Sequence, residues 1–177
     1  MLIRTSAKFR RQYRCAMEET DPPVRPFPQT WNVDLISNGP RQLIVLASEE
    51  FSLFSILVPT GRARNVKTFL DAFRERLLQL FEDIRIHSAD RPDLNQFTFV
   101  GRTDKKIIGS QNDMIFHARV FLSEAIQPAS PDILRDIERH LNDMPMSYLG
   151  MDQPLDALRK KTEWLIRPHI AGDAPRC

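Results

Sequence analysis

Over residues 65–84, apolar side chains recur every three or four positions, and this is the strongest periodic pattern in the chain. The apolar positions are Phe69, Leu70, Phe73, Leu77, Leu80, Phe81 and Ile84. This spacing places them on one face of an α-helix, which Asn65 can begin as its N-cap. We therefore expect a long helix from about residue 65 to about residue 83, with its apolar face packed on a sheet.

Short apolar segments on both sides of this helix have the character of β-strands. They are MLIRT (1–5), VDLI (33–36), RQLIVLA (41–47), SLFSILV (52–58) and FTFVGRT (97–103). Asn38-Gly39 suits the positive φ angles of a hairpin turn, so the second and third segments should pair antiparallel, with the fourth added beside them. The continuous apolar run 43–47 is typical of a strand that is covered on both faces.

Three further helices are predicted in the second half of the chain. One begins near Ser110. Another begins at Ser130-Pro131, an N-cap followed by proline at the first helical position. The last covers about 154–166, with Leu155, Leu158, Thr162 and Leu165 facing inward.

These elements predict an α+β fold, with a mostly antiparallel sheet of four or five strands packed by about four helices. The proline-rich segment 20–31 is expected to be an extended connector. We expect a single globular domain over residues 1–166 and a disordered tail over 167–177.

Composition excludes several classes of protein. A formal charge of +2 over 177 residues is too small to indicate a nucleic-acid binder by itself. Cys15 and Cys177 form neither a disulfide framework nor a zinc motif. The chain has no apolar signal segment and no run long enough to span a membrane, so the expected location is the cytoplasm, without membrane association.

The segment IIGSQNDMIFH, residues 107–117, offers candidate catalytic residues. Ser110 followed by Asp113 resembles a capping box, and Met114 would begin the buried face of the helix. Asp113 and His117 stand four positions apart and can pair, with Asn112 as a hydrogen-bond donor. A capped core helix with a surface Asp–His pair is the simpler interpretation, because no Ser or Cys nucleophile accompanies them.

The same segment can also be interpreted as an anion-binding loop. Gly109 and Ser110 would present free backbone amides, and Arg102, Lys105 and Lys106 precede them. The negative charge of Asp113 counts against this interpretation. No phosphate-binding loop or dinucleotide fingerprint occurs.

The N-terminal segment is basic and contains no acid in its first 17 residues. Its cations are Arg4, Lys8, Arg10, Arg11 and Arg14. Phe9 and Tyr13 lie between them and could stack on nucleic-acid bases. The alternative is a solvated helix face whose charge is balanced by Glu18, Glu19 and Asp21.

No metal or cofactor site is predicted. The four histidines, His87, His117, His140 and His169, are scattered without ligand spacing. Pairs such as Asp136 and His140 are explained by i,i+4 helix pairing. Trp31 and Trp164 are expected to be packing groups.

Several segments share their order with one known family. They are MLIRTSAK from Met1, WNVDLI from Trp31, RQLIVL from Arg41, SLFSI from Ser52, IGSQNDMIFH from Ile108, NDMPM from Asn142 and PLDAL from Pro154. Together they resemble a family of short bacterial proteins classified as a domain of unknown function. Its N-terminal pattern is M-x-I-R-x-S/T-x-K, and its central pattern is G-S-x-N-D-M/L. Arg41-Gln42-Leu43 stands where that family has Arg-Lys-Cys, so no role for a cysteine there is carried over. The resemblance implies the fold and its boundaries and supplies no catalytic residues.

The function expected from the sequence is a non-enzymatic binding or regulatory module for nucleic acid or a protein partner. One form of it is a component of a bacterial defence or toxin–antitoxin operon. The alternative is a hydrolase or nuclease that uses Asn112, Asp113 and His117. The sequence leaves the oligomeric state open.

Overall fold

The computed structural model describes residues 1–18, 22–23, 25, 27–38, 42–60, 65–86, 91–102, 104–125 and 128–166. The strands are β1 Leu2–Thr5, β2 Thr30–Asn38, β3 Gln42–Glu49, β4 Ser55–Thr60 and β5 Thr98–Gly101. The helices are α1 Ala7–Tyr13, α2 Val66–Asp83, α3 Lys105–Glu124, α4 Pro131–Asn142 and α5 Pro154–Ile166. A short 3-10 helix, η2 Ser147–Leu149, lies between α4 and α5.

The five strands form one sheet in the order β4-β3-β2-β1-β5. β2–β3 and β3–β4 are antiparallel, as the hairpin signal predicted, whereas β1 is parallel to both β2 and β5. The α+β class is confirmed, but the sheet is mixed and not mostly antiparallel. The N-terminal strand enters between two later strands, and local turn signals do not report such a pairing because parallel neighbours are joined by long crossovers.

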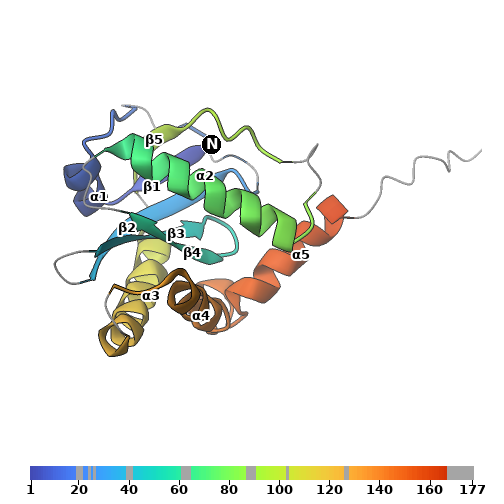
Figure 1. Ribbon diagram of the computed structural model, residues 1–177. Coiled ribbons are helices and arrows are strands. Elements are labelled where there is room, and N and C mark those ends of the chain that lie inside the picture. The colour runs from blue at the N-terminus through green and yellow to red at the C-terminus, as the bar shows by residue number, and fades with distance from the viewer. Residues whose placement is uncertain are drawn as a thin grey trace, which may run out of the picture.

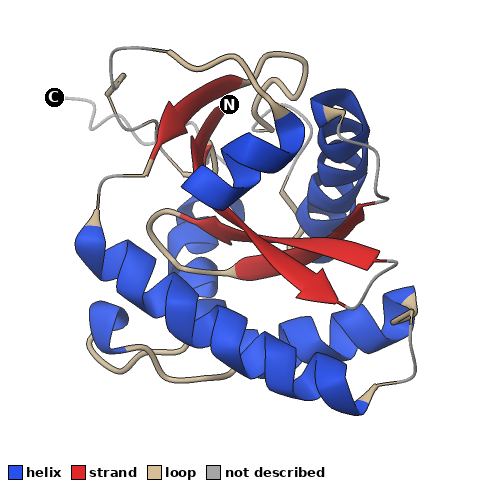
Figure 2. Ribbon diagram, turned by 90° about the vertical axis from the view of Figure 1, so that its left-hand side faces the viewer, coloured by secondary structure: helices blue, strands red, loops and turns tan. Residues whose placement is uncertain are grey.

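Helices cover both faces of the sheet (Figure 1). α1 and α2 lie on one face over a core that includes Trp31, Phe69 and Phe73, while α3 and α4 lie on the other. Figure 2 shows the strands between these two helical layers. Trp31 is fully buried and meets Phe73 edge to face at 5.6 Å, so its predicted packing role is confirmed.

Side chains of α4 close the β4 edge of the sheet. The Asn142 side-chain oxygen accepts from the Ser55 amide at 2.7 Å, and its nitrogen donates to the Ser55 carbonyl at 2.8 Å. Glu138 accepts from the Leu57 amide at 2.6 Å. Pro59 has no amide hydrogen to satisfy, which is why proline is tolerated on an edge strand. These contacts leave little of the β4 edge free to pair with another strand.

Replacing Asn142 with alanine should lower the free energy of unfolding by about 2 kcal/mol, because it leaves two buried backbone groups of Ser55 without partners. Urea unfolding followed by circular dichroism measures the change. Asn95→Ala is the matched control, since Asn95 is exposed, and it should be neutral. Equal stability of the two variants would contradict the proposed closure of the edge.

The predicted start of α3 at Ser110 was wrong. The helix begins at Lys105, and its N-cap is Asp104, whose carboxylate accepts from the Lys106 and Ile107 amides at 2.8 and 3.2 Å. The Gly109-Ser110 pair lies inside the helix. Burial of Ile107 and Met114 against the sheet stabilises this turn against the low helix propensity of glycine.

The other predicted helices are confirmed. α2 begins after Asn65, whose side chain accepts from the Lys67 amide, and α4 begins after Ser130. β2 begins at Thr30, within the segment expected to be a connector. The predicted tail 167–177 lies outside the described residues. In the described part of the chain, no helix combines the length and the apolar character needed to cross a membrane.

Candidate functional site

A layer of polar side chains lies between the sheet and α3. Successive side chains of a strand point to opposite faces, so Arg4 of β1, Asn32 and Asp34 of β2 and Ser48 of β3 all face this helix. All four are buried. Gln111 of α3 is fully buried above them. Buried polar groups need hydrogen-bond partners, and the side chains of Asn32, Asp34, Ser48 and Gln111 have them.

Asp34 is the centre of this polar layer. One of its carboxylate oxygens accepts from the Ser6 hydroxyl at 2.6 Å and from the Leu35 amide at 2.7 Å. The other accepts from Arg102 at 2.9 Å. Arg102 also donates to Gln111, which in turn donates to the Asn32 carbonyl at 2.7 Å. The network therefore ties α3 and the end of β5 to the middle of the sheet.

Two of the cations predicted to bind anions belong to the interior. Arg4 is 4% exposed and forms an ion pair with Glu50 at 3.4 Å. Glu50 also accepts from Asn32. Arg102 is committed to Asp34. The fold thus removes Arg4 and Arg102 from the basic surface that the sequence suggested.

The expected stacking of Phe9 and Tyr13 on bases was wrong. Both rings are buried on the sheet-facing side of α1, where they contact Phe69 at 5.0 and 5.8 Å. The Tyr13 hydroxyl donates to Thr60 at 2.6 Å. Their i,i+4 spacing, interpreted as aromatic interleaving, is the apolar face of an amphipathic helix.

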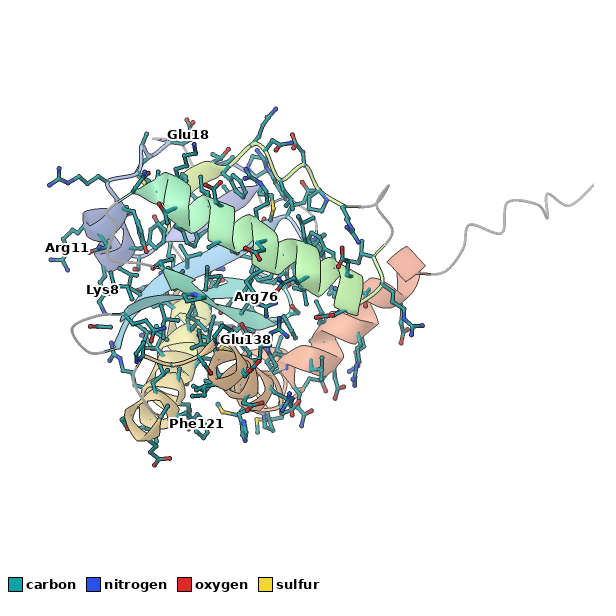
Figure 3. All side chains as sticks on the ribbon, in the orientation of Figure 1. Lys8, Arg11, Glu18, Arg76, Phe121 and Glu138 are labelled. Atoms are coloured by element: carbon teal, nitrogen blue, oxygen red, sulfur yellow. The ribbon has the colours of Figure 1, made fainter. Side chains whose placement is uncertain are left out.

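The exposed cations that remain on α1 are Lys8, Arg11 and Arg14, and Arg10 is half-buried. Figure 3 shows Lys8 and Arg11 extending from the same side of the molecule, while Glu18 lies apart from them. Glu18 therefore does not balance their charge as the alternative interpretation required. Glu19 and Asp21 lie outside the described residues.

Arg119 of α3 joins this group, although no sequence pattern singled it out. Partial burial lowers the pKa of Lys8, and Arg119 and Arg11 lower it further, while Asp34 acts in the opposite direction. The Lys8 ammonium donates to the Leu35 carbonyl at 2.9 Å. We call Lys8, Arg11 and Arg119 the α1–α3 basic surface. Only packing of α1 and α3 at the end of β2 brings these residues together.

A separate groove lies between the first half of α3 and η2. It has a cavity volume of about 450 Å³ and is lined by Lys105, Lys106, Gly109, Ser110, Asp113, Ser147 and Tyr148. We call it the α3–η2 groove. On the helix, the two lysines precede Gly109 by one turn, and Asp113 follows it by one turn.

The polar side chains of the α3–η2 groove are not engaged with one another. Within the described part of the chain, none of them makes a side-chain hydrogen bond or an ion pair. Ser110 is only 7% exposed, yet its hydroxyl has no protein partner there. Burial raises the pKa of Tyr148, and Asp104, Glu50 and Glu49 raise it further, so the phenol stays a hydrogen-bond donor.

The predicted anion cradle of free amides at Gly109 and Ser110 was wrong, because these residues occupy the fifth and sixth positions of α3. Their amides belong to the helical hydrogen-bond ladder. Four of the predicted anion-site residues nevertheless line one groove: Lys105, Lys106, Gly109 and Ser110. They are neighbours because they lie on consecutive turns of α3, and not because their amides are free.

The candidate catalytic residues do not converge. Asn112 and Asp113 are exposed and His117 is half-buried, with its ring against Phe116 at 5.5 Å. Only Asp113 lines the groove, and no hydrogen bond joins it to His117 in the described structure.

Two smaller cavities, of about 190 and 230 Å³, lie between α2 and α4. Both are lined by Arg76 and Glu138, which form an ion pair with each other at 2.6 Å. Figure 3 shows these side chains meeting between the two helices. Arg76 and Glu138 therefore satisfy each other, unlike the charged side chains of the α3–η2 groove.

The described residues contain no group of three or more His, Cys, Asp or Glu side chains placed to hold a metal ion. His140 contacts the Asp136 carbonyl at 2.8 Å through Nδ1, which is an ordinary contact within a helix. His87 and His169 lie outside the described residues.

Comparison with known proteins defines the class but not an activity. The chain belongs to the family described as a domain of unknown function (DUF6933), which it matches over residues 2–157. No curated protein and no solved structure matches the chain.

Proposed function

We propose that this protein is a non-enzymatic binding module that contacts nucleic-acid phosphates through the α1–α3 basic surface. Two observations support the proposal: Lys8, Arg11 and Arg119 are all exposed on two helices, and both arginines act electrostatically on Lys8. No acidic side chain in the described residues forms an ion pair with any of them.

Like charges held close together raise the free energy of the unbound protein, and an anionic partner offsets that cost. Asp34 is the carboxylate that acts on Lys8, but both of its oxygens are occupied by Ser6, Leu35 and Arg102. The positive field is therefore available to an external anion.

Contacts of this kind bind the phosphate backbone and do not distinguish bases. Because Phe9 and Tyr13 are buried, they contribute no base stacking. We therefore expect binding that depends weakly on sequence and steeply on salt.

Replacing Lys8, Arg11 and Arg119 together with alanine should weaken binding to a labelled DNA or RNA oligonucleotide at about 50 mM salt by tenfold or more. The slope of log affinity against log salt should fall by about 2–3, because up to three phosphate contacts are lost. Fluorescence anisotropy at several salt concentrations measures both quantities.

The matched control removes the same charge from α5 by changing Arg159, Lys160 and Lys161, all exposed, to alanine. It should keep the slope of the unchanged protein. Equal weakening in both triple variants, or no binding of the unchanged protein at low salt, would refute the proposal.

A further inference from the structure

We propose that the α3–η2 groove binds a small phosphomonoester that also carries an amino group, with the phosphate at Lys105 and Lys106 and the amine at Asp113. This site is distinct from the α1–α3 basic surface. It is formed by the first half of α3 and η2, whereas Arg119 lies in the second half of α3.

Gly109 keeps the groove open. A Cβ atom built at this position would meet nothing within 4 Å, and the backbone is helical, so neither packing nor conformation requires glycine. Glycine is a poor helix former and weakens α3 here. A side chain at this position would project into the groove, so its absence lets a ligand approach the helix surface.

Ser110 supplies a hydroxyl that makes no hydrogen bond to the described residues. The residue is more than nine-tenths buried, lines the groove, and has no hydrogen-bond partner among the described residues. The hydroxyl oxygen is not sealed from solvent, so a ligand oxygen in the groove can reach it and accept its hydrogen bond. On the opposite wall, the hydroxyl groups of Ser147 and Tyr148 are likewise available to donate.

The charges of the groove are separated along the helix. Lys105 and Lys106 lie one turn before Gly109 and Asp113 one turn after it, which places the two charged ends about 10–12 Å apart along the axis. Two ammonium groups complement the nearly two negative charges of a phosphomonoester. The Asp113 carboxylate repels a second anionic group and favours an amine.

The size of the groove indicates a free small molecule. Its cavity volume of about 450 Å³ lies within the range that small-molecule sites occupy. A ligand of this class is recognised as a free molecule, which titration with a peptide-borne phosphate can test.

The test is calorimetric titration of the full chain with O-phosphoethanolamine, inorganic phosphate and ethanolamine. We expect O-phosphoethanolamine to bind about tenfold more tightly than either fragment, because it engages both ends of the groove. Asp113→Asn should reduce its affinity to that of inorganic phosphate. Equal affinity for all three compounds, or an unchanged preference in D113N, would overturn the assignment.

Gly109→Leu should abolish binding by filling the groove, while leaving the helix intact, since leucine is a strong helix former. Ser123→Leu is the matched control on the exposed part of the same helix and should bind as the unchanged protein does. Circular dichroism shows that both variants are folded. Unimpaired binding in G109L would place the ligand elsewhere.

Titration with a phosphoserine peptide distinguishes a free small-molecule ligand from a phosphorylated protein segment. Tighter binding of this peptide than of O-phosphoethanolamine would refute the small-molecule assignment. G109L should retain its affinity for nucleic acid, so this proposal and the proposed function can fail independently.

Discussion

Replacing Asp34 with alanine is expected to lower the free energy of unfolding by about 3–5 kcal/mol. The change leaves the Arg102 guanidinium, whose side chain is only 10% exposed, without its charged partner. It also removes the acceptor of the Ser6 hydroxyl and the Leu35 amide. Urea unfolding monitored by tryptophan fluorescence measures the loss, and Trp31 in the adjacent core provides the signal.

Two further variants show whether the charge causes the effect. Asp34→Ala combined with Arg102→Met should recover part of the lost stability, because no uncompensated buried charge remains. Asp71→Ala breaks the exposed Arg74–Asp71 pair and should cost less than about 1 kcal/mol. A loss in D34A no larger than that in D71A would show that the ion pair contributes little.

The stability of the unchanged protein should fall as the pH rises from 4.5 to about 7, and Glu49 should be a main cause. Burial raises the pKa of Glu49 to about 7, against the partial opposition of hydrogen bonds from Ser52 and Phe51. The folded protein then holds this proton more tightly than the unfolded chain does, so stability falls between the unfolded and folded pKa values. A shift of this size corresponds to about 3 kcal/mol.

Glu49→Gln should remove this part of the pH dependence. The glutamine oxygen can accept the same hydrogen bonds from Ser52 and Phe51, and the side chain does not titrate. Burial also raises the pKa of Glu138, so a smaller decline of the same sign should persist. Urea unfolding at several pH values measures the slope. The exposed Glu18→Gln variant should behave as the unchanged protein does, and equal slopes in E49Q and the unchanged protein would contradict the role of Glu49.

Residues of the segment 107–117 face either the sheet or the α3–η2 groove. Gln111 and Met114 point into the sheet, where Gln111 joins the polar layer and Met114 packs in the core. Gly109 and Asp113 line the α3–η2 groove on the outer side. The helical repeat explains how adjacent residues in one short segment can serve the interior and the surface at once.

Local patterns in the sequence predicted elements whose causes are local. The apolar repeat of α2, the Ser130-Pro131 start of α4 and the β2–β3 hairpin were all predicted correctly. Each depends on side-chain period or turn and cap chemistry within a few residues. The start of α3 was missed because the Gly109-Ser110 pair resembles a turn, while its stability within a helix comes from packing on the sheet.

Local sequence patterns were therefore sufficient to predict the α+β class, most element positions and the neighbouring candidates Lys105, Lys106, Gly109 and Ser110. The parallel position of β1 between β2 and β5, and the internal position of Arg4 and Arg102, depend on the three-dimensional fold and were not predicted. The same fold places Arg119 near Lys8, and Tyr148 near the first half of α3. The reason is physical: these contacts join residues far apart in the chain, and the free energy that forms them comes from burying both faces of the sheet.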